Sequence, residues 1–222
     1  MRLLLIFLSL STLQSACVSQ KAYTSATPLS QVKDIHMFEP LAFISLIEKG
    51  NQMAHSDSLS NYFSQRWSLI AANIPDLPVE GLVKIPGFVE TEVLKTEIDQ
   101  LFFWAEEAGG RNLNPLELPP NLVATMDHHN QRFYMLTLSS GFTRREGNYT
   151  GQLVKGVALT FLTMGIYSPM PLKANSAVQV MILDNQLGEI TFYKNSFNPE
   201  GEPLENKTLL KHAKFLFKGY FW

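Results

Sequence analysis

The chain of 222 residues contains one cysteine, Cys17, so no disulfide can form within it. The residues before Cys17 have the order of a secretion signal: Arg2 is followed by an apolar run, residues 3–10, and then by small and polar residues. That run is too short to span a bilayer. We therefore expect residues 1–16 to be a signal peptide that is removed. The rest of the chain must then be stable outside the cytoplasm by packing alone.

The segment Leu13-Gln14-Ser15-Ala16-Cys17 resembles the lipobox of bacterial envelope lipoproteins, in which small residues precede a cysteine that is lipidated on sulfur. It departs from the family pattern at Gln14, where an aliphatic residue is usual. The resemblance implies that Cys17 carries palmitate-type acyl chains and attaches the protein to a membrane. Because Val18 rather than Asp follows the cysteine, it also implies an outer-membrane location in a cell with two membranes. The alternatives are a soluble secreted form with a free thiol and a misread start.

The composition of the remaining chain is that of a globular protein, with 45% hydrophobic and 17% charged residues overall. The net charge is −2, and it becomes −3 when Arg2 is removed with the signal, so we expect no nucleic-acid partner. Residues 17–31 are mostly polar and predict the lipidated cysteine followed by a flexible tether. Residues 32–222 are expected to form a single domain, with a possible internal boundary near 110–120, where prolines cluster.

Hydrophobic periodicity divides the domain into two halves. The first half predicts mainly helices, at about 38–49, 59–73 and 89–108, with a short extended segment within 79–89. The second half predicts a strand at 132–139, a buried helix at 153–167, a hairpin formed by 178–184 and 189–195, and a helix at 203–218. The order predicts an α+β fold, with a helical N-terminal half followed by a small, mostly antiparallel sheet (β-α-β-β-α) covered by helices.

A glycine-rich loop, residues 140–151, is the first candidate ligand site. It lies between the predicted strand and the predicted buried helix, and it contains Arg144, Arg145, Asn148 and Thr150. Guanidinium groups beside a helix N-terminus can hold a small anion or a lipid-like headgroup. The alternative is a surface turn in which Asn148 or Thr150 caps the helix.

The predicted last helix carries a row of lysines on one face, Lys207, Lys211, Lys214 and Lys218. On a protein tethered near a bilayer, such a row could contact anionic headgroups. The alternative is an ordinary solvated helix face. The aromatic C-terminal tail, residues 215–222, is expected to fold back onto the core.

No motif in the sequence identifies a reaction. Asp127-His128-His129 has no recognised metal-ligand spacing, and no Gly-x-Ser-x-Gly motif surrounds a serine, so no metal, cofactor or catalytic residue is predicted. The leading hypothesis is a membrane-tethered, non-enzymatic domain that binds another envelope component, such as an envelope protein. The alternatives are a binding module for a small anionic or lipid-like ligand and a hydrolase whose active site is assembled from distant residues.

Overall fold

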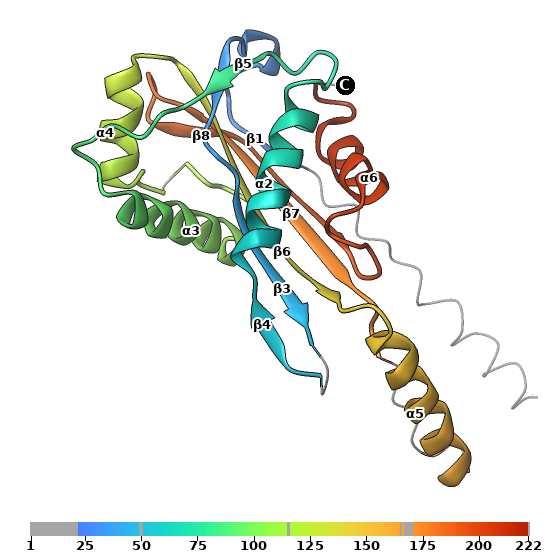
Figure 1. Cartoon of the computed structure of the whole chain (residues 1–222). Coiled ribbons are helices and arrows are strands. Elements are labelled where there is room, and N and C mark those ends of the chain that lie inside the picture. Colours follow the sequence, from blue (N-terminus) through green and yellow to red (C-terminus); the bar gives the residue numbers. More distant parts are fainter. Residues whose placement is uncertain (1–21, 49–50, 115, 165, 167–170, 222) are drawn as a thin grey trace, which may run out of the picture.

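The computed structural model describes residues 22–221 except for 49–50, 115, 165 and 167–170, and within these residues it contains an eight-stranded mixed sheet with five α-helices (Figure 1). The signal peptide and Cys17 lie outside the described residues. The strands are β1 (Tyr23–Thr24), β2 (Ile35–Met37), β3 (Leu41–Ile47), β4 (Met53–His55), β5 (Val79–Leu82), β6 (Phe133–Arg144), β7 (Asn175–Asp184) and β8 (Glu189–Asn198). The helices are α2 (Asp57–Ala71), α3 (Thr91–Glu107), α4 (Pro120–His129), α5 (Asn148–Leu162) and α6 (Asn206–Phe217), with a 3-10 turn, η1 (Leu29–Gln31).

The fold is therefore mixed α+β, but the predicted helical N-terminal half is wrong. Five of the eight strands described lie before residue 83. In particular, the segment expected to be a helix at 38–49 contains β3, which pairs in parallel with β6 from Leu41↔Leu138 to Ile47↔Arg144. The apolar segment Leu41–Ile47 suits a buried strand as well as a helix, and pairing with β6 decides between them.

Strand β6 lies inside the sheet and pairs with other strands along both of its edges. One edge pairs antiparallel with β7 over ten residue pairs. The other edge pairs in parallel first with β2 and then with β3. The predicted β7–β8 hairpin is confirmed, and its turn contains Gly188 at φ 63°. The buried Asp184 side chain also stabilises this turn, because its Oδ1 accepts hydrogen bonds from the backbone N–H groups of Gln186 and Leu187.

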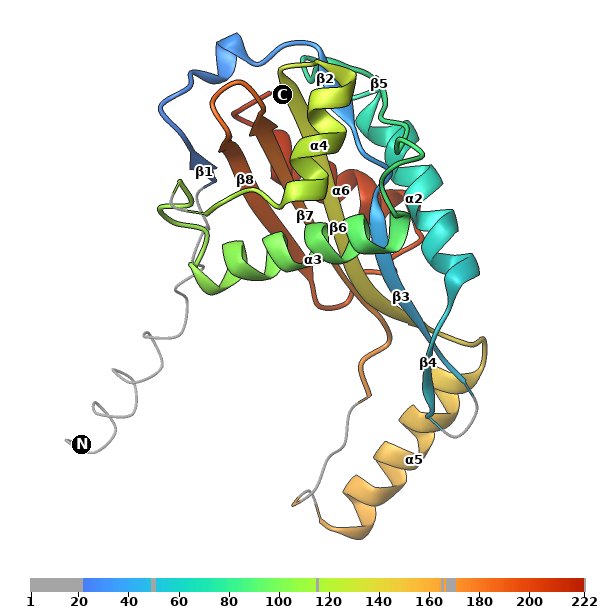
Figure 2. The same ribbon diagram turned by 90° about the vertical axis from the view of Figure 1, so that its left-hand side faces the viewer.

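Helices cover both faces of the sheet, so the part of the chain that the structure describes has three layers (Figure 2). On one face, α2 and α6 pack on alternate strand residues such as Val180 and Ile182. On the other face, α3 and α4 pack on the intervening residues, such as Met181 and Leu183. Since α3 and α4 share one core, the helices on either side of residues 110–120 belong to the same packed unit.

Helix α5 is the exception to this layered packing. It begins at Asn148, before the predicted start, and it extends away from the three layers (Figures 1 and 2). The structure describes every residue of α5, and Gly156 is the single buried one. The predicted burial of this helix is therefore wrong, since no layer of the domain covers α5. In the described part of the chain, no helix is both long and apolar enough to cross a membrane.

The first described residue, Ala22, contacts Tyr220, near the C-terminal end of the described chain, at the end of the sheet remote from α5. The backbone N–H of Ala22 donates to the Tyr220 hydroxyl at 3.2 Å. Strand β1 pairs with β8. Both β1 and η1 lie within residues 17–31, the range predicted to be a flexible tether. Phe217 and Phe221 are buried against Phe192, which confirms that the described part of the aromatic tail folds back onto the core.

Candidate functional site

The two arginines predicted to bind an anion are engaged by the protein itself. Strand β6 extends to Arg144, whose Nε donates to the Leu172 carbonyl oxygen at 2.7 Å. Its Nη1 donates to Asn51 Oδ1 at 2.7 Å and to Asn148 Oδ1 at 2.9 Å. Arg145 is more exposed and forms an ion pair with Glu48 at 2.9 Å. These contacts join the β3–β4 connection to the start of α5 without a ligand, so the anion site stays a prediction.

The other two residues of the predicted anion site lie in the first turn of α5. Asn148 donates through Nδ2 to the Glu48 carbonyl oxygen at 2.7 Å, and Thr150 is exposed. The alternative prediction, that one of them caps the helix, is wrong, because Gly147 occupies the N-cap position at φ 78° and no side chain caps it. Arg144, Arg145 and Asn148 are thus brought together, while Thr150 takes no part in their network.

The lysine row lies on the solvent face of α6. Lys207, Lys211, Lys214 and Lys218 are all exposed, and the opposite face of the helix buries Leu209, Ala213 and Leu216. Exposure is expected for a membrane-facing row and for a solvated one, so it does not separate them. Their position is more informative. Lys218, the last lysine of the row, lies two residues before Tyr220, which contacts Ala22, the first described residue of the domain.

A serine–histidine contact of the kind expected in a hydrolase does exist, but it is buried. His212 Nδ1 lies 2.8 Å from Ser196 Oγ, and its Nε2 lies 3.0 Å from Ser176 Oγ. His212 is 1% exposed, and both of its ring nitrogens are occupied by serine hydroxyls. Burial lowers the pKa of His212 to about 4, and Lys211 contributes to the same shift. A catalytic serine needs access to substrate and a base free to take its proton. This cluster therefore connects α6 to β7 and β8 as a structural element.

The Asp127-His128-His129 segment ends helix α4 and is engaged in local contacts. His129 Nε2 lies 2.6 Å from the Lys84 carbonyl oxygen, His128 packs edge-on against Phe88, and Asp127 accepts a hydrogen bond from Asn185. Among the described residues, no group of three or more His, Cys, Asp or Glu side chains is placed to hold a metal ion.

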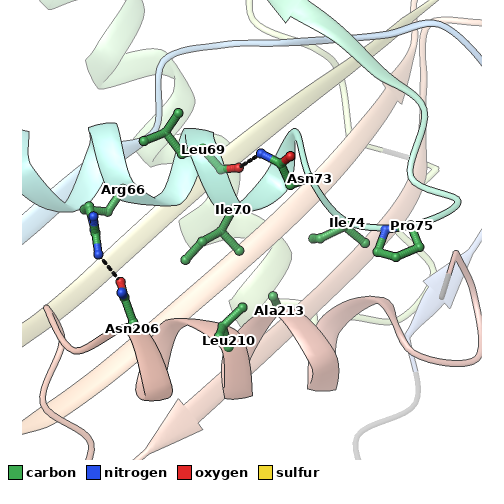
Figure 3. A pocket seen from close by; sticks show the side chains of 9 residues that line it. All are labelled: Arg66, Leu69, Ile70, Asn73, Ile74, Pro75, Asn206, Leu210 and Ala213. Carbon is green, nitrogen blue, oxygen red and sulfur yellow. Dashed lines mark hydrogen bonds between the residues drawn. The ribbon is translucent and has the colours of Figure 1, made fainter.

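An apolar hollow of about 420 Å³ lies between α2 and α6 (Figure 3). Leu69 and Ile70 line it from α2, and Leu210 and Ala213 line it from α6. The side chains of Arg66 and Asn206 hydrogen-bond to each other across one end. The hollow offers few polar groups that would orient a small ligand, which distinguishes it from a typical ligand site.

Among the described residues, α5 and the segment just after it expose several large apolar side chains. Val154 is 62% exposed, Phe161 80% and Leu162 79%, and just beyond the helix Met164 is 94% exposed. Soluble domains rarely expose apolar side chains in such a contiguous group unless the group meets a partner or a membrane. The prediction of a buried helix missed this surface. The sequence does carry a signal for it, because residues 147–183 contain no Asp or Glu.

Strand β1, the first described strand, and α5 lie at opposite ends of the sheet. Thr24 pairs with Phe192, which pairs with Ile182, whereas β7 begins at Asn175 beside α5. The seven residue-to-residue steps from 175 to 182 span about 24 Å at about 3.4 Å each. Helix α5 adds about 22 Å for its 15 residues at about 1.5 Å each. The domain is thus elongated, and both α6 and α5 lie on its right-hand side in Figure 1.

Comparison with known proteins gives little further information. No protein family and no curated protein matches the chain. Among solved structures, it is similar to the C-terminal domain of LpoB from Salmonella enterica, with a TM-score of 0.29 and 10% sequence identity. The match covers 76% of this chain and 85% of that domain. At this TM-score the likeness carries no weight for fold or function.

Proposed function

We propose that the protein is a lipoprotein of the bacterial envelope, attached through Cys17, and that its domain is a non-enzymatic module that contacts another envelope component through α5. The exposed apolar surface of α5 carries this proposal. Burying each large side chain there would contribute about 1.5–3 kcal/mol, so the surface is a source of binding energy that the isolated domain leaves unused.

The position of the anchor agrees with this function. Cys17 is five residues from Ala22, so a fully extended chain places the lipid within about 18 Å of the domain surface beside Tyr220. The lysine row ends near the same place, with Lys218 two residues before Tyr220. We infer that Lys214 and Lys218 lie near the headgroups of the membrane that holds the lipid, which is the outer membrane in a cell with two membranes. Anionic lipid attracts each lysine by about 1 kcal/mol.

Photo-crosslinking in the native envelope tests the use of α5. A benzophenone amino acid at Phe161 should crosslink strongly to an envelope component. The matched control is the same amino acid at Phe88, which is 66% exposed but lies at the far side of the domain from α5. Equal crosslinking from the two positions, or none from Phe161, would contradict the proposal.

The lipid anchor has its own test. Cells are labelled with an alkyne fatty acid, and the wild-type protein is compared with Cys17→Ala. Label and membrane association should both be lost in the variant. Equal labelling and equal membrane fractionation of the two proteins would exclude lipidation at Cys17.

A further inference from the structure

The end of α5 exposes large apolar side chains over about 200° of its circumference, from Val157 round to Leu159, and Thr160 lies on the remaining side. Successive residues of a helix are rotated by about 100°. Taking Leu159 as zero, Phe161 points to about 200° and Leu162 to about 300°. All three side chains are exposed, at 42%, 80% and 79%. Beyond the helix, Met164 and Ile166 are 94% and 91% exposed. This face is wider than the stripe of about 100° that a helix usually buries against protein, and a fluid apolar medium can cover its whole width.

The charge pattern around this surface suits a bilayer. Residues 147–183 contain no carboxylate and two lysines, Lys155 and Lys173. A carboxylate next to the hydrocarbon would be costly and would be repelled by anionic headgroups, whereas lysines at the rim are attracted to them.

Helix α5 is also weak on its own. It contains Gly151 and Gly156, together with the β-branched residues Thr150, Val154, Val157 and Thr160. An isolated helix of 15 residues with this composition is marginal in water. In an apolar medium the backbone groups cannot exchange their hydrogen bonds with water, so the helix is favoured there.

We propose that the component contacted by α5 is the lipid bilayer itself, and that the end of α5 around Phe161, Leu162 and Met164 inserts into it. This inference rests on the proposed function in taking α5 as the contact surface. Helix α5 is about 22 Å long, shorter than a hydrocarbon core of about 30 Å, so it enters one leaflet and does not cross. In Figure 1, α6 and α5 both lie on the right-hand side of the domain, and the proposal places the membrane on that side.

The absence of any second cysteine makes the test direct. The mature chain with Cys17→Ala, which has no lipid, receives Phe161→Cys and an environment-sensitive NBD label. Vesicles of phosphatidylethanolamine and phosphatidylglycerol should shift the NBD emission to the blue and should float with the protein. A label at Phe88→Cys should not shift.

Two variants separate the apolar and charged contributions. Leu162→Ser with Met164→Ser should reduce partitioning by at least about tenfold. Both side chains are exposed, so circular dichroism and urea unfolding of this variant should match those of the parent. Lys155→Gln should weaken binding about fivefold on anionic vesicles and leave binding to phosphatidylcholine vesicles unchanged.

Three outcomes would overturn the inference. If the label at residue 161 is unmoved by vesicles while the benzophenone at the same position captures a protein in the native envelope, α5 binds a protein, and the proposed function stands without the bilayer contact. If sedimentation without vesicles shows self-association that requires Leu162 and Met164, the surface is covered by a second copy. If neither vesicles nor the native envelope respond to position 161, both proposals fail.

Discussion

The buried His212 makes the stability of the domain depend on pH. Its imidazole is held between Ser176 and Ser196 and is 1% exposed, and burial lowers its pKa from 6.5 to about 4. The folded state therefore holds this histidine neutral at a pH where the unfolded chain already binds a proton. The free energy of unfolding that depends on keeping His212 neutral is fully present above pH 6.5 and is lost as the pH falls toward 4.

The size of the effect follows from the two pKa values. Between about pH 7.5 and about pH 5, His212 alone should reduce the free energy of unfolding by about 2 kcal/mol. The full loss, reached below pH 4, is about 3 kcal/mol. Carboxylates also titrate in this range, so the prediction concerns a difference between two proteins.

The measurement is urea unfolding of the mature chain carrying Cys17→Ala at the two pH values, with and without His212→Asn. Asparagine does not titrate, so the variant should be less stable at neutral pH but should lose about 2 kcal/mol less between the two pH values. Equal losses in both proteins would refute the reasoning. So would an NMR titration showing His212 protonated with a pKa near 6.5.

Three further predictions concern packing, a buried ion pair and the arginine loop. In urea unfolding, Gly141→Ala should reduce the free energy of unfolding by about 1–3 kcal/mol, because an added Cβ would lie 2.5 Å from the Asn175 carbonyl oxygen. The control is Gly151→Ala, whose added Cβ would meet nothing within 4 Å, and this variant should lose no stability. Asp184→Asn should reduce the free energy of unfolding by about 3 kcal/mol, because Asp184 is fully buried and Arg132 would lose its ion-pair partner at 2.8 Å. The control is Glu92→Gln, at an exposed ion pair with Lys95, which should change the free energy of unfolding by less than about 1 kcal/mol. If the arginine loop holds an anion, Arg144→Ala with Arg145→Ala should remove a bound species from the native mass spectrum of protein purified from cells, and an unchanged spectrum would count against that site.

The sequence predicts correctly those elements whose pattern is local. Helices α2, α3 and α6 have apolar residues at helical spacing, and the β7–β8 hairpin has two β-prone segments on either side of a turn with Gly188. The seven-residue β3 has no such pattern. Its residues 41–47 suit either a helix or a strand, and the partner that decides, β6, lies almost 100 residues later in the chain.

The candidate site is harder to predict because its partners are distant in sequence. Residues 140–151 do lead from a strand into a helix, as expected. Arg145, however, forms an ion pair with Glu48, which is 97 residues away in the sequence. Arg144 donates a hydrogen bond to Asn51, which is 93 residues away. For α5, the apolar composition of a buried helix and of an uncovered one is the same. Whether anything covers it depends on where β6 and β7 end, which periodicity does not reveal.

The path of β6 has a mechanical consequence. If one end of the domain is held by a lipid and the other by α5, tension between them runs along the strands. The hydrogen bonds between β6 and β7 are perpendicular to that direction. The ten residue pairs from Phe133↔Asp184 to Phe142↔Asn175 would then be loaded together in shear, and none could open before the others. Such a sheet resists pulling between its two ends far better than peeling from its edge, where β4 is held by three pairs to β3.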